Sequence, residues 1–250
     1  MSPDPIVIGP ELGNPQSLNK YSYAFNNPLK MVDPDGRWPF YIHNLIYQIA
    51  FAGVYNSHQI SVIEKESLKM DFGPGQQGSD PDHTHQHAMC SSGESVEDCD
   101  AGVARTVNRD FAAAQANSGD ESLEWEADGL HTVTDLGSPM HTDSDGHGRI
   151  WNDGFFASLR HEAGEITIDD HVYEIGMSIR NAIEFDALLH PDHAKAMGGI
   201  SAWEREAASA FAHAVSSQTA QPRFSGSAGN NELFEEKVRQ CALGNRAACE

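Results

Sequence analysis

The sequence predicts an all-α protein in which a compact helical domain follows a short irregular or β-structured tail. Apolar residues recur at helical spacing from residue 42 to about residue 216, and convincing strand alternation is absent. Residues 1–37, by contrast, are rich in Pro, Asn, Gly and Asp and have no helical period, which is typical of turns and short strands. We therefore expect a tail at 1–37, a helical domain at 38–217 and a C-terminal extension at 218–250.

The helical pattern divides into seven segments. They span residues 42–52, 59–69, 94–116, 121–136, 155–165, 171–189 and 200–216. The stretch 72–86 holds Gly, Pro, Gln, Asp and His and predicts a long loop, and a second loop is expected from 139 to about 153. Loops of that length in a compact domain are usually functional or disordered. Residues 218–231 predict a linker, and 232–242 a short amphipathic helix that docks on the domain.

Composition narrows the class of protein. The chain has 250 residues, 39% of them apolar, which is enough for one sizeable core. Its net charge of −21 argues against a large nucleic-acid interface, which usually shows as a basic patch. No apolar run approaches the ~18 residues of a membrane span, so we expect no transmembrane segment. The four cysteines form two close pairs, Cys90/Cys99 and Cys241/Cys249, compatible with two disulfides or with free, small apolar side chains.

Thirteen histidines are present, and the best organised group lies near the middle of the chain. His131 and Asp135 are four residues apart on a predicted helix, so their side chains share one face. Pro139 then ends the helix and can turn His141 back beside them. A second pair, His161 and Glu165, has the same spacing. Imidazole and carboxylate ligands with room for water are typical of catalytic rather than structural zinc.

This spacing resembles the superfamily of zinc-dependent phospholipases C and single-strand nucleases. The string Leu-His-x3-Asp-x3-Pro-Met-His begins at Leu130, and the pair His161-x3-Glu165 follows in the expected order. The resemblance covers about residues 38–216 and implies a helical domain that holds three zinc ions. The phospholipase branch tends to end on Glu at the last ligand and the nuclease branch on Asp, so Glu165 favours a phospholipase.

The resemblance also implies ligands nearer the N-terminus. The family uses a histidine in its first helix, matched here by His43, and a tryptophan at the mature N-terminus, matched by Trp38. His58 competes with His43 but has no tryptophan within reach. An aspartate and a histidine should follow, and Asp71 and His87 fit in order and approximate spacing. The alternatives at these two positions are Asp80, Asp82, His83 and His85.

Residues 14–37 carry a second resemblance, to the end of an Rhs repeat-associated core. Such shells enclose a C-terminal toxin and cut themselves after an Asp-Pro-x-Gly-x motif, which is Asp33-Pro34-Asp35-Gly36-Arg37 here. A cut after Arg37 would release Trp38 as a free N-terminus, where the zinc superfamily uses its tryptophan. This resemblance implies a delivered toxin effector that acts outside the producing cell or in a target cell, with the shell in cis and an immunity protein as partners.

By resemblance, the zinc ligands fall into three groups. One ion would lie on Asp71, His87, His131 and Asp135, a second on His141, His161 and Glu165, and a third on Trp38, His43 and Asp135. The expected activity is hydrolysis of phospholipid headgroups, with transient contact to a membrane surface, and Asp71 also acts as general base. The alternatives are a zinc-dependent nuclease of the same superfamily and a zinc-stabilised module without catalysis.

Overall fold

The computed structural model describes residues 40–74, 76, 78–151, 171–218 and 229–249 of the chain. In this part the protein is mostly helical, and its extended pairing is limited to two isolated bridges, Cys90–Ile150 and Thr142–Gly148. The predicted all-α class is therefore confirmed for the described residues. The tail at 1–37 and the predicted helix at 155–165 lie outside them.

Helices lie close to most of the predicted segments. The long ones are α1 (Phe40–Ala50), α2 (Ser57–Phe72), α4 (Val96–Ala116), α5 (Asp120–Asp135), α7 (Val172–Leu189), α9 (Ile200–Gln218) and α10 (Gly229–Ala242). Short elements are α3 (Pro81–Thr84), η3 (His85–His87), α8 (Pro191–Ala196) and η6 (Arg246–Ala248). The prediction of a continuous loop at 72–86 was wrong, because α2 extends to Phe72 and α3 and η3 follow. These elements, like α8, are too short to show a helical period.

Local signals explain where the site-bearing helices begin. The Asn56 side chain accepts hydrogen bonds from the backbone N–H groups of His58 and Gln59. The Gln59 side chain in turn accepts one from the Asn56 backbone N–H, which completes a capping box at the start of α2. At the start of α4, the Ser95 hydroxyl accepts from the Asp98 N–H. Both caps satisfy backbone donors that a helix N-terminus leaves open.

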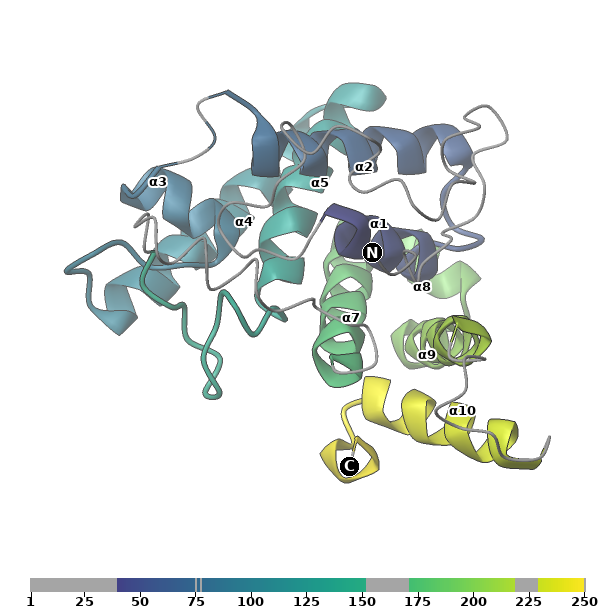
Figure 1. The fold of residues 1–250 in the computed structure, drawn as a ribbon. Helices are drawn as coiled ribbons and strands as arrows, with labels where there is room; N and C mark the ends of the chain where they lie inside the picture. The colour runs from purple at the N-terminus through teal and green to yellow at the C-terminus, as the bar shows by residue number, and fades with distance from the viewer. Residues whose placement is uncertain (1–39, 75, 77, 152–170, 219–228, 250) are drawn as a thin grey trace, which may run out of the picture.

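Helix α5 lies at the centre of the arrangement and packs against α2, α4 and α7 (Figure 1). Helix α1, drawn in purple, packs against α2, α7 and α9. The close approach of α5 to α7 depends on Gly129, where an added Cβ would lie 2.5 Å from the Phe185 ring. Trp203 of α9 is almost fully buried and donates its indole N–H to the Ala50 carbonyl at 2.6 Å. These contacts join α5 to α7 and α9 to α1 around one apolar core.

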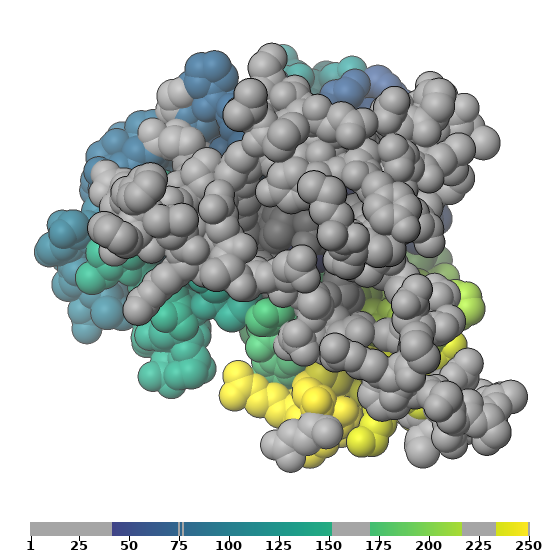
Figure 2. Space-filling view, viewed as in Figure 1, coloured from purple at the N-terminus to yellow at the C-terminus, as the bar shows by residue number. Residues whose placement is uncertain are grey.

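The C-terminal segment packs onto this body. Figure 2 shows it in yellow against the green surface of the preceding helices, and α10 contacts both α7 and α9. A Cβ at Gly176 of α7 would lie 2.4 Å from Ala242 Cα, so the two helices meet closely. Cys241, in the last turn of α10, forms a disulfide with Cys249. The described helix begins at Gly229, three residues before the predicted start. No described helix is both long and apolar enough to cross a bilayer.

Candidate metal centre

Six of the nine candidate metal ligands fall within the described residues, and all six lie in one buried cluster. They are His43, Asp71, His87, His131, Asp135 and His141, none more than 4% exposed. The other three, Trp38, His161 and Glu165, lie outside the described part of the chain. Buried imidazoles and carboxylates are costly unless they are paired or bind a metal, so the cluster needs an explanation.

Four helical elements and the turn after α5 bring these side chains together. His43 comes from α1, Asp71 from α2 and His87 from η3, while His131 and Asp135 come from α5. The backbone turns after α5, where the His141 N–H donates to the Ser138 carbonyl at 3.1 Å. This turn places His141 Nδ1 3.2 Å from Asp135 Oδ2. The helix-then-turn arrangement predicted around Pro139 is therefore present.

Asp135 divides its two oxygens between different neighbours. Oδ1 lies 3.2 Å from His43 Nε2, whereas Oδ2 lies 3.2 Å from His131 Nε2 and 3.3 Å from His87 Nδ1. His131 Nε2 is also 3.0 Å from His87 Nδ1 and 3.6 Å from Asp71 Oδ1. Two nitrogens bound tetrahedrally to one zinc at 2.0–2.1 Å lie about 3.3 Å apart. The observed separations fall on both sides of that value, and Asp135 is placed to bridge two ions.

Hydrogen bonds determine which nitrogen carries the proton on two of the imidazoles. His141 Nδ1 lies 2.6 Å from the His87 carbonyl, which can only accept, so Nδ1 is the donor. The Thr134 hydroxyl donates its single hydrogen to the His131 carbonyl at 2.9 Å and must accept from His43 Nδ1 at 3.1 Å. In both neutral rings the lone pair is then on Nε2, which is the usual arrangement for a metal-bound histidine.

Three buried atoms of the cluster lack a hydrogen bond. They are His43 Nε2, His141 Nε2 and Asp135 Oδ1. His43 Nε2 and Asp135 Oδ1 are close enough to bond, yet their geometry does not satisfy a hydrogen bond. Buried polar atoms are rarely left without a partner, and two lone pairs and a carboxylate oxygen are what a cation requires. The donor set therefore fits zinc.

The charge of Asp135 suits the same role. Burial by itself would raise the pKa of this carboxyl, but the adjoining imidazoles of His141 and His131 lower it well below its ordinary value. Asp135 is therefore ionised throughout the physiological range. A carboxylate that stays ionised at full burial is a strong ligand for a divalent cation.

The alternative candidates contact other partners. His83 Nδ1 lies 2.6 Å from the exposed Asp80 carboxylate, and His85 Nε2 lies 2.9 Å from Glu94. Asp82 is exposed in the first turn of α3. His58, the competitor of His43, pairs with Asp120 in an exposed contact at 2.9 Å. Of the alternatives that the sequence left open, the structure brings Asp71 and His87 into the cluster.

Sequence reasoning missed the side chains that hold the cluster from behind. Tyr47 donates to the Ser67 hydroxyl at 3.1 Å, and Ser67 shares a 3.0 Å hydrogen bond with His131 Nδ1. Tyr47 lies four residues after His43 on α1, and Ser67 four residues before Asp71 on α2. This i,i+4 spacing was the available signal, because it places each residue on the face of a candidate ligand.

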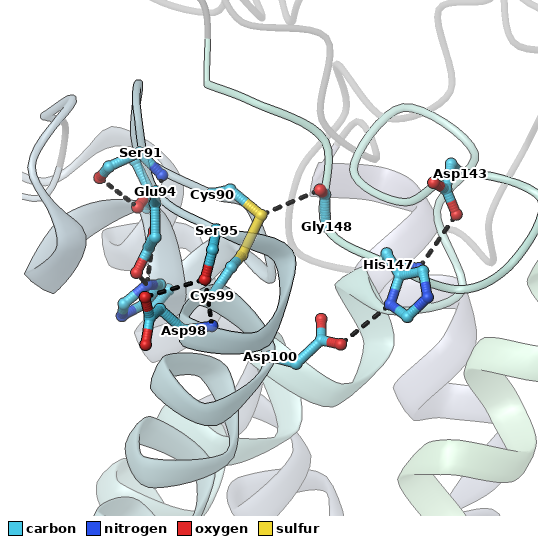
Figure 3. Close-up of a disulfide and its surroundings, with 12 residues drawn as sticks. Cys90, Ser91, Glu94, Ser95, Asp98, Cys99, Asp100, Asp143, His147 and Gly148 are labelled. Carbon is cyan, nitrogen blue, oxygen red and sulfur yellow. Dashed lines mark hydrogen bonds and ion pairs between the residues drawn. A yellow bond between two sulfur atoms is a disulfide. The ribbon is translucent and has the colours of Figure 1, made fainter.

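The Cys90–Cys99 disulfide supports the segment that follows His87 (Figure 3). Cys99 belongs to α4, and Cys90 pairs through its backbone with the segment that follows His141. Its N–H donates to the Arg149 carbonyl at 2.9 Å, and its carbonyl accepts from the Trp151 N–H at 2.7 Å. Trp151 is buried, with its ring centroid 5.9 Å from that of His87. The disulfide thus connects two ligand-bearing segments to α4.

No protein-family model, curated protein or solved structure matches the chain.

Proposed function

We propose that the protein is a zinc-dependent phosphodiester hydrolase of the phospholipase C type. One observation carries the proposal. Six side chains predicted as ligands, which come from positions 43 to 141, meet in one buried cluster. Ligand atoms of five of them, all except His141, lie at distances that suit metal ligands. A helical protein without a metal would have little reason to bury four imidazoles around two carboxylates.

The cluster supports two neighbouring ion positions. His87, His131 and Asp135 have ligand atoms within 4.8 Å of one another, and so do His43, Asp71 and His131. Asp135 would bridge, with Oδ1 on the side of His43 and Oδ2 on the side of His131. His141 Nε2 has no hydrogen bond and is free to bind an ion. We propose that His161 and Glu165 are the other two ligands of that ion. Trp38 would complete the site of His43.

When bound, the ions would polarise a phosphodiester and lower the pKa of water to near neutrality. The ligand residues would fix the positions of the ions relative to one another, so that the substrate phosphorus binds beside them. Asp71, buried at 4% exposure at the edge of the cluster, is the proposed general base that accepts a proton from the attacking water. A chain with a net charge of −21 repels anions, so the local positive field of the ions also explains how a phosphate reaches this site.

Two points favour a phospholipid over a nucleic acid. Glu165 is the last residue of the ligand motif, and the phospholipases that this motif resembles tend to have Glu there. The acidic composition also offers no extended basic surface for a polynucleotide. A nuclease of the same superfamily is the second candidate, and hydrolysis of lecithin vesicles compared with single-stranded DNA separates the two.

The Rhs-like motif supports a role as a toxin effector enclosed by its shell until delivery. A cut after Arg37 would convert the backbone amide nitrogen of Trp38 into a free amine, which could then bind the ion held by His43. We expect the chain that begins at Trp38 to bind more zinc and to turn over faster than the uncut chain. Equal zinc content and equal rates in the two forms would remove the activation proposal and leave the hydrolase proposal intact.

The decisive experiment measures bound zinc and hydrolysis of a chromogenic phosphodiester. His131→Ala and Asp135→Ala should each lose activity by at least about 10³-fold and lose bound zinc. His58→Ala is the matched control, since His58 is an exposed histidine paired to an aspartate. Full activity in the two cluster variants would contradict the proposal. Zinc retention without turnover on any phosphoester would instead identify a zinc-stabilised, non-catalytic module.

A further inference from the structure

A second group of metal-ligating side chains lies outside the proposed hydrolase site. Glu126 of α5 and Asp186 of α7 are both fully buried, and Tyr55 lies between them. His190 precedes α8 and His193 lies within it. Both histidines are partly exposed, and each contacts one of the buried carboxylates.

The contacts in this group are short. His190 Nε2 lies 3.1 Å from Glu126 Oε2, and His193 Nδ1 lies 3.0 Å from Asp186 Oδ2. Ligand atoms of Glu126, Asp186 and His190 all lie within 4.8 Å of one another, and the two imidazole centroids are 4.8 Å apart. These spacings are close to those between ligands of one small divalent cation.

The hydrogen count shows that the two contacts of Tyr55 are short of one hydrogen when both acids are ionised. The Tyr55 hydroxyl oxygen lies 2.7 Å from Glu126 Oε1 and 2.6 Å from Asp186 Oδ1. Oxygen–oxygen contacts this short each require a hydrogen between them, but Tyr55 has only one. One buried carboxylate oxygen therefore faces another oxygen without a hydrogen whenever both acids are ionised. An extra proton would supply that hydrogen, whereas a cation on the opposite oxygens would offset the negative charge of the two buried carboxylates.

We infer that Glu126, Asp186, His190 and His193 form a second, structural binding site for a zinc-like divalent metal ion. Two nitrogen and two carboxylate donors suit borderline cations such as Zn²⁺. Glu126, Asp186 and His190 would supply three ligands, and His193, which contacts Asp186, would supply the fourth. Four protein ligands would close a tetrahedral site and leave no position for a substrate, which is typical of a structural site. Tyr55 lies behind the carboxylates, where its hydroxyl contacts Glu126 Oε1 and Asp186 Oδ1 and can donate its single hydrogen to one of them.

The location of the site explains what the ion does. The ligands come from α5, α7 and the start of α8, and Tyr55 comes from the connection between α1 and α2. One ion would therefore clamp elements that are distant in sequence. The histidine side chains are 33% and 28% exposed, whereas the carboxylates are fully buried, so an ion can enter from the histidine side.

The test titrates Zn²⁺ into the full chain after chelation and measures stoichiometry and affinity by calorimetry. His190→Ala/His193→Ala should lose one equivalent of zinc, or bind it about 100-fold more weakly, and should lose the increase in melting temperature that this equivalent produces. His58→Ala/His213→Ala is the matched control, because these exposed histidines also pair with acids, and it should behave as wild type.

A second variant keeps the inference testable if the double alanine variant does not fold. His131→Ala/Asp135→Ala disables the proposed hydrolase site and should still bind zinc through His190 and His193. Unchanged stoichiometry and affinity in His190→Ala/His193→Ala would overturn the inference, as would a folded His131→Ala/Asp135→Ala protein that binds no zinc. In those cases an extra shared proton neutralises the group. Failure of the hydrolase proposal would appear separately, as full phosphodiesterase activity in His131→Ala/Asp135→Ala.

Discussion

The imidazole of His141 donates from Nδ1 to the backbone carbonyl of His87 at 2.6 Å. This bond joins two candidate ligands that are far apart in sequence. It also determines the chemistry of the other nitrogen, because a neutral imidazole that donates from Nδ1 carries its lone pair on Nε2. His141 Nε2 is buried without a hydrogen bond. The backbone of one ligand segment thus prepares the side chain of the next to bind a metal.

A substitution that replaces Nδ1 of His141 but not Nε2 tests this relationship. In His141→Asn the amide can replace Nδ1 and still donate to the His87 carbonyl, but nothing replaces Nε2. After chelation, we expect this variant to have a melting temperature close to that of metal-free wild type. On addition of zinc it should bind much less of it than wild type and should lose most activity. Calorimetric melting and metal analysis provide the measurements. An Asn variant with wild-type zinc content would show that His141 is only a structural hydrogen-bond donor.

The hydroxyl groups behind the cluster should control metal affinity. Thr134→Val preserves shape but removes the acceptor for His43 Nδ1, and Ser67→Ala removes the partner of His131 Nδ1. Loss of such a partner typically costs 10–100-fold in metal affinity, and we expect that range for each variant. Competition with a chromogenic zinc chelator measures the change. Thr134→Ser, which keeps the hydroxyl, should restore affinity; an equal loss in Thr134→Ser would assign the effect to packing.

The two disulfides provide a matched pair for separating stability from metal binding. Each double variant removes one cross-link: Cys90→Ala/Cys99→Ala the first and Cys241→Ala/Cys249→Ala the second. The loops that the two disulfides close are similar in size, with sequence separations of 9 and 8. Each variant should lower the free energy of unfolding by about 2–3 kcal/mol through loss of loop closure in the unfolded chain. Only the first disulfide supports segments that carry His87 and His141. We therefore expect weaker zinc binding in Cys90→Ala/Cys99→Ala alone, measured by the same chelator competition. Equal affinities in the two variants would contradict a supporting role for this disulfide.

Asp128 should make stability fall as pH rises. Burial, reinforced by the negative charge of Asp110, raises the pKa of Asp128 to about 7. Because the folded-state pKa lies above the unfolded value of 3.8, the protonated carboxyl stabilises the fold fully below pH 3.8, and that contribution is lost as pH rises through 7. Asp128→Asn should therefore gain about 2–3 kcal/mol relative to wild type on going from pH 5 to pH 8. Urea unfolding at the two pH values checks this.

The control for that measurement is Asp145→Asn, a substitution at an exposed aspartate in the segment after His141. Its free energy of unfolding relative to wild type should not depend on pH by more than a few tenths of a kcal/mol. A pH dependence of the same size in both variants would attribute the effect to net charge rather than to the environment of Asp128.

The features that sequence alone predicted are the local ones. Helical periodicity located most long helices, because apolar spacing reports which face of a helix is buried. His131, Asp135 and His141 could be grouped because four-residue spacing and a proline turn act over one or two helical turns. For the same reason short elements such as α8 were missed, since six residues do not complete a recognisable period.

The tertiary structure decided which distant residues meet. Nothing in the sequence near Asp71 or His87 distinguishes them from Asp80, Asp82, His83 and His85; they join the cluster because α2 and η3 pack against α5. His190 and His193 have buried partners only because α5 and α7 place Glu126 and Asp186 beside them. Sequence spacing determines which side chains share a face of one helix, whereas contacts between helices depend on how whole apolar faces pack, which is a property of the complete core.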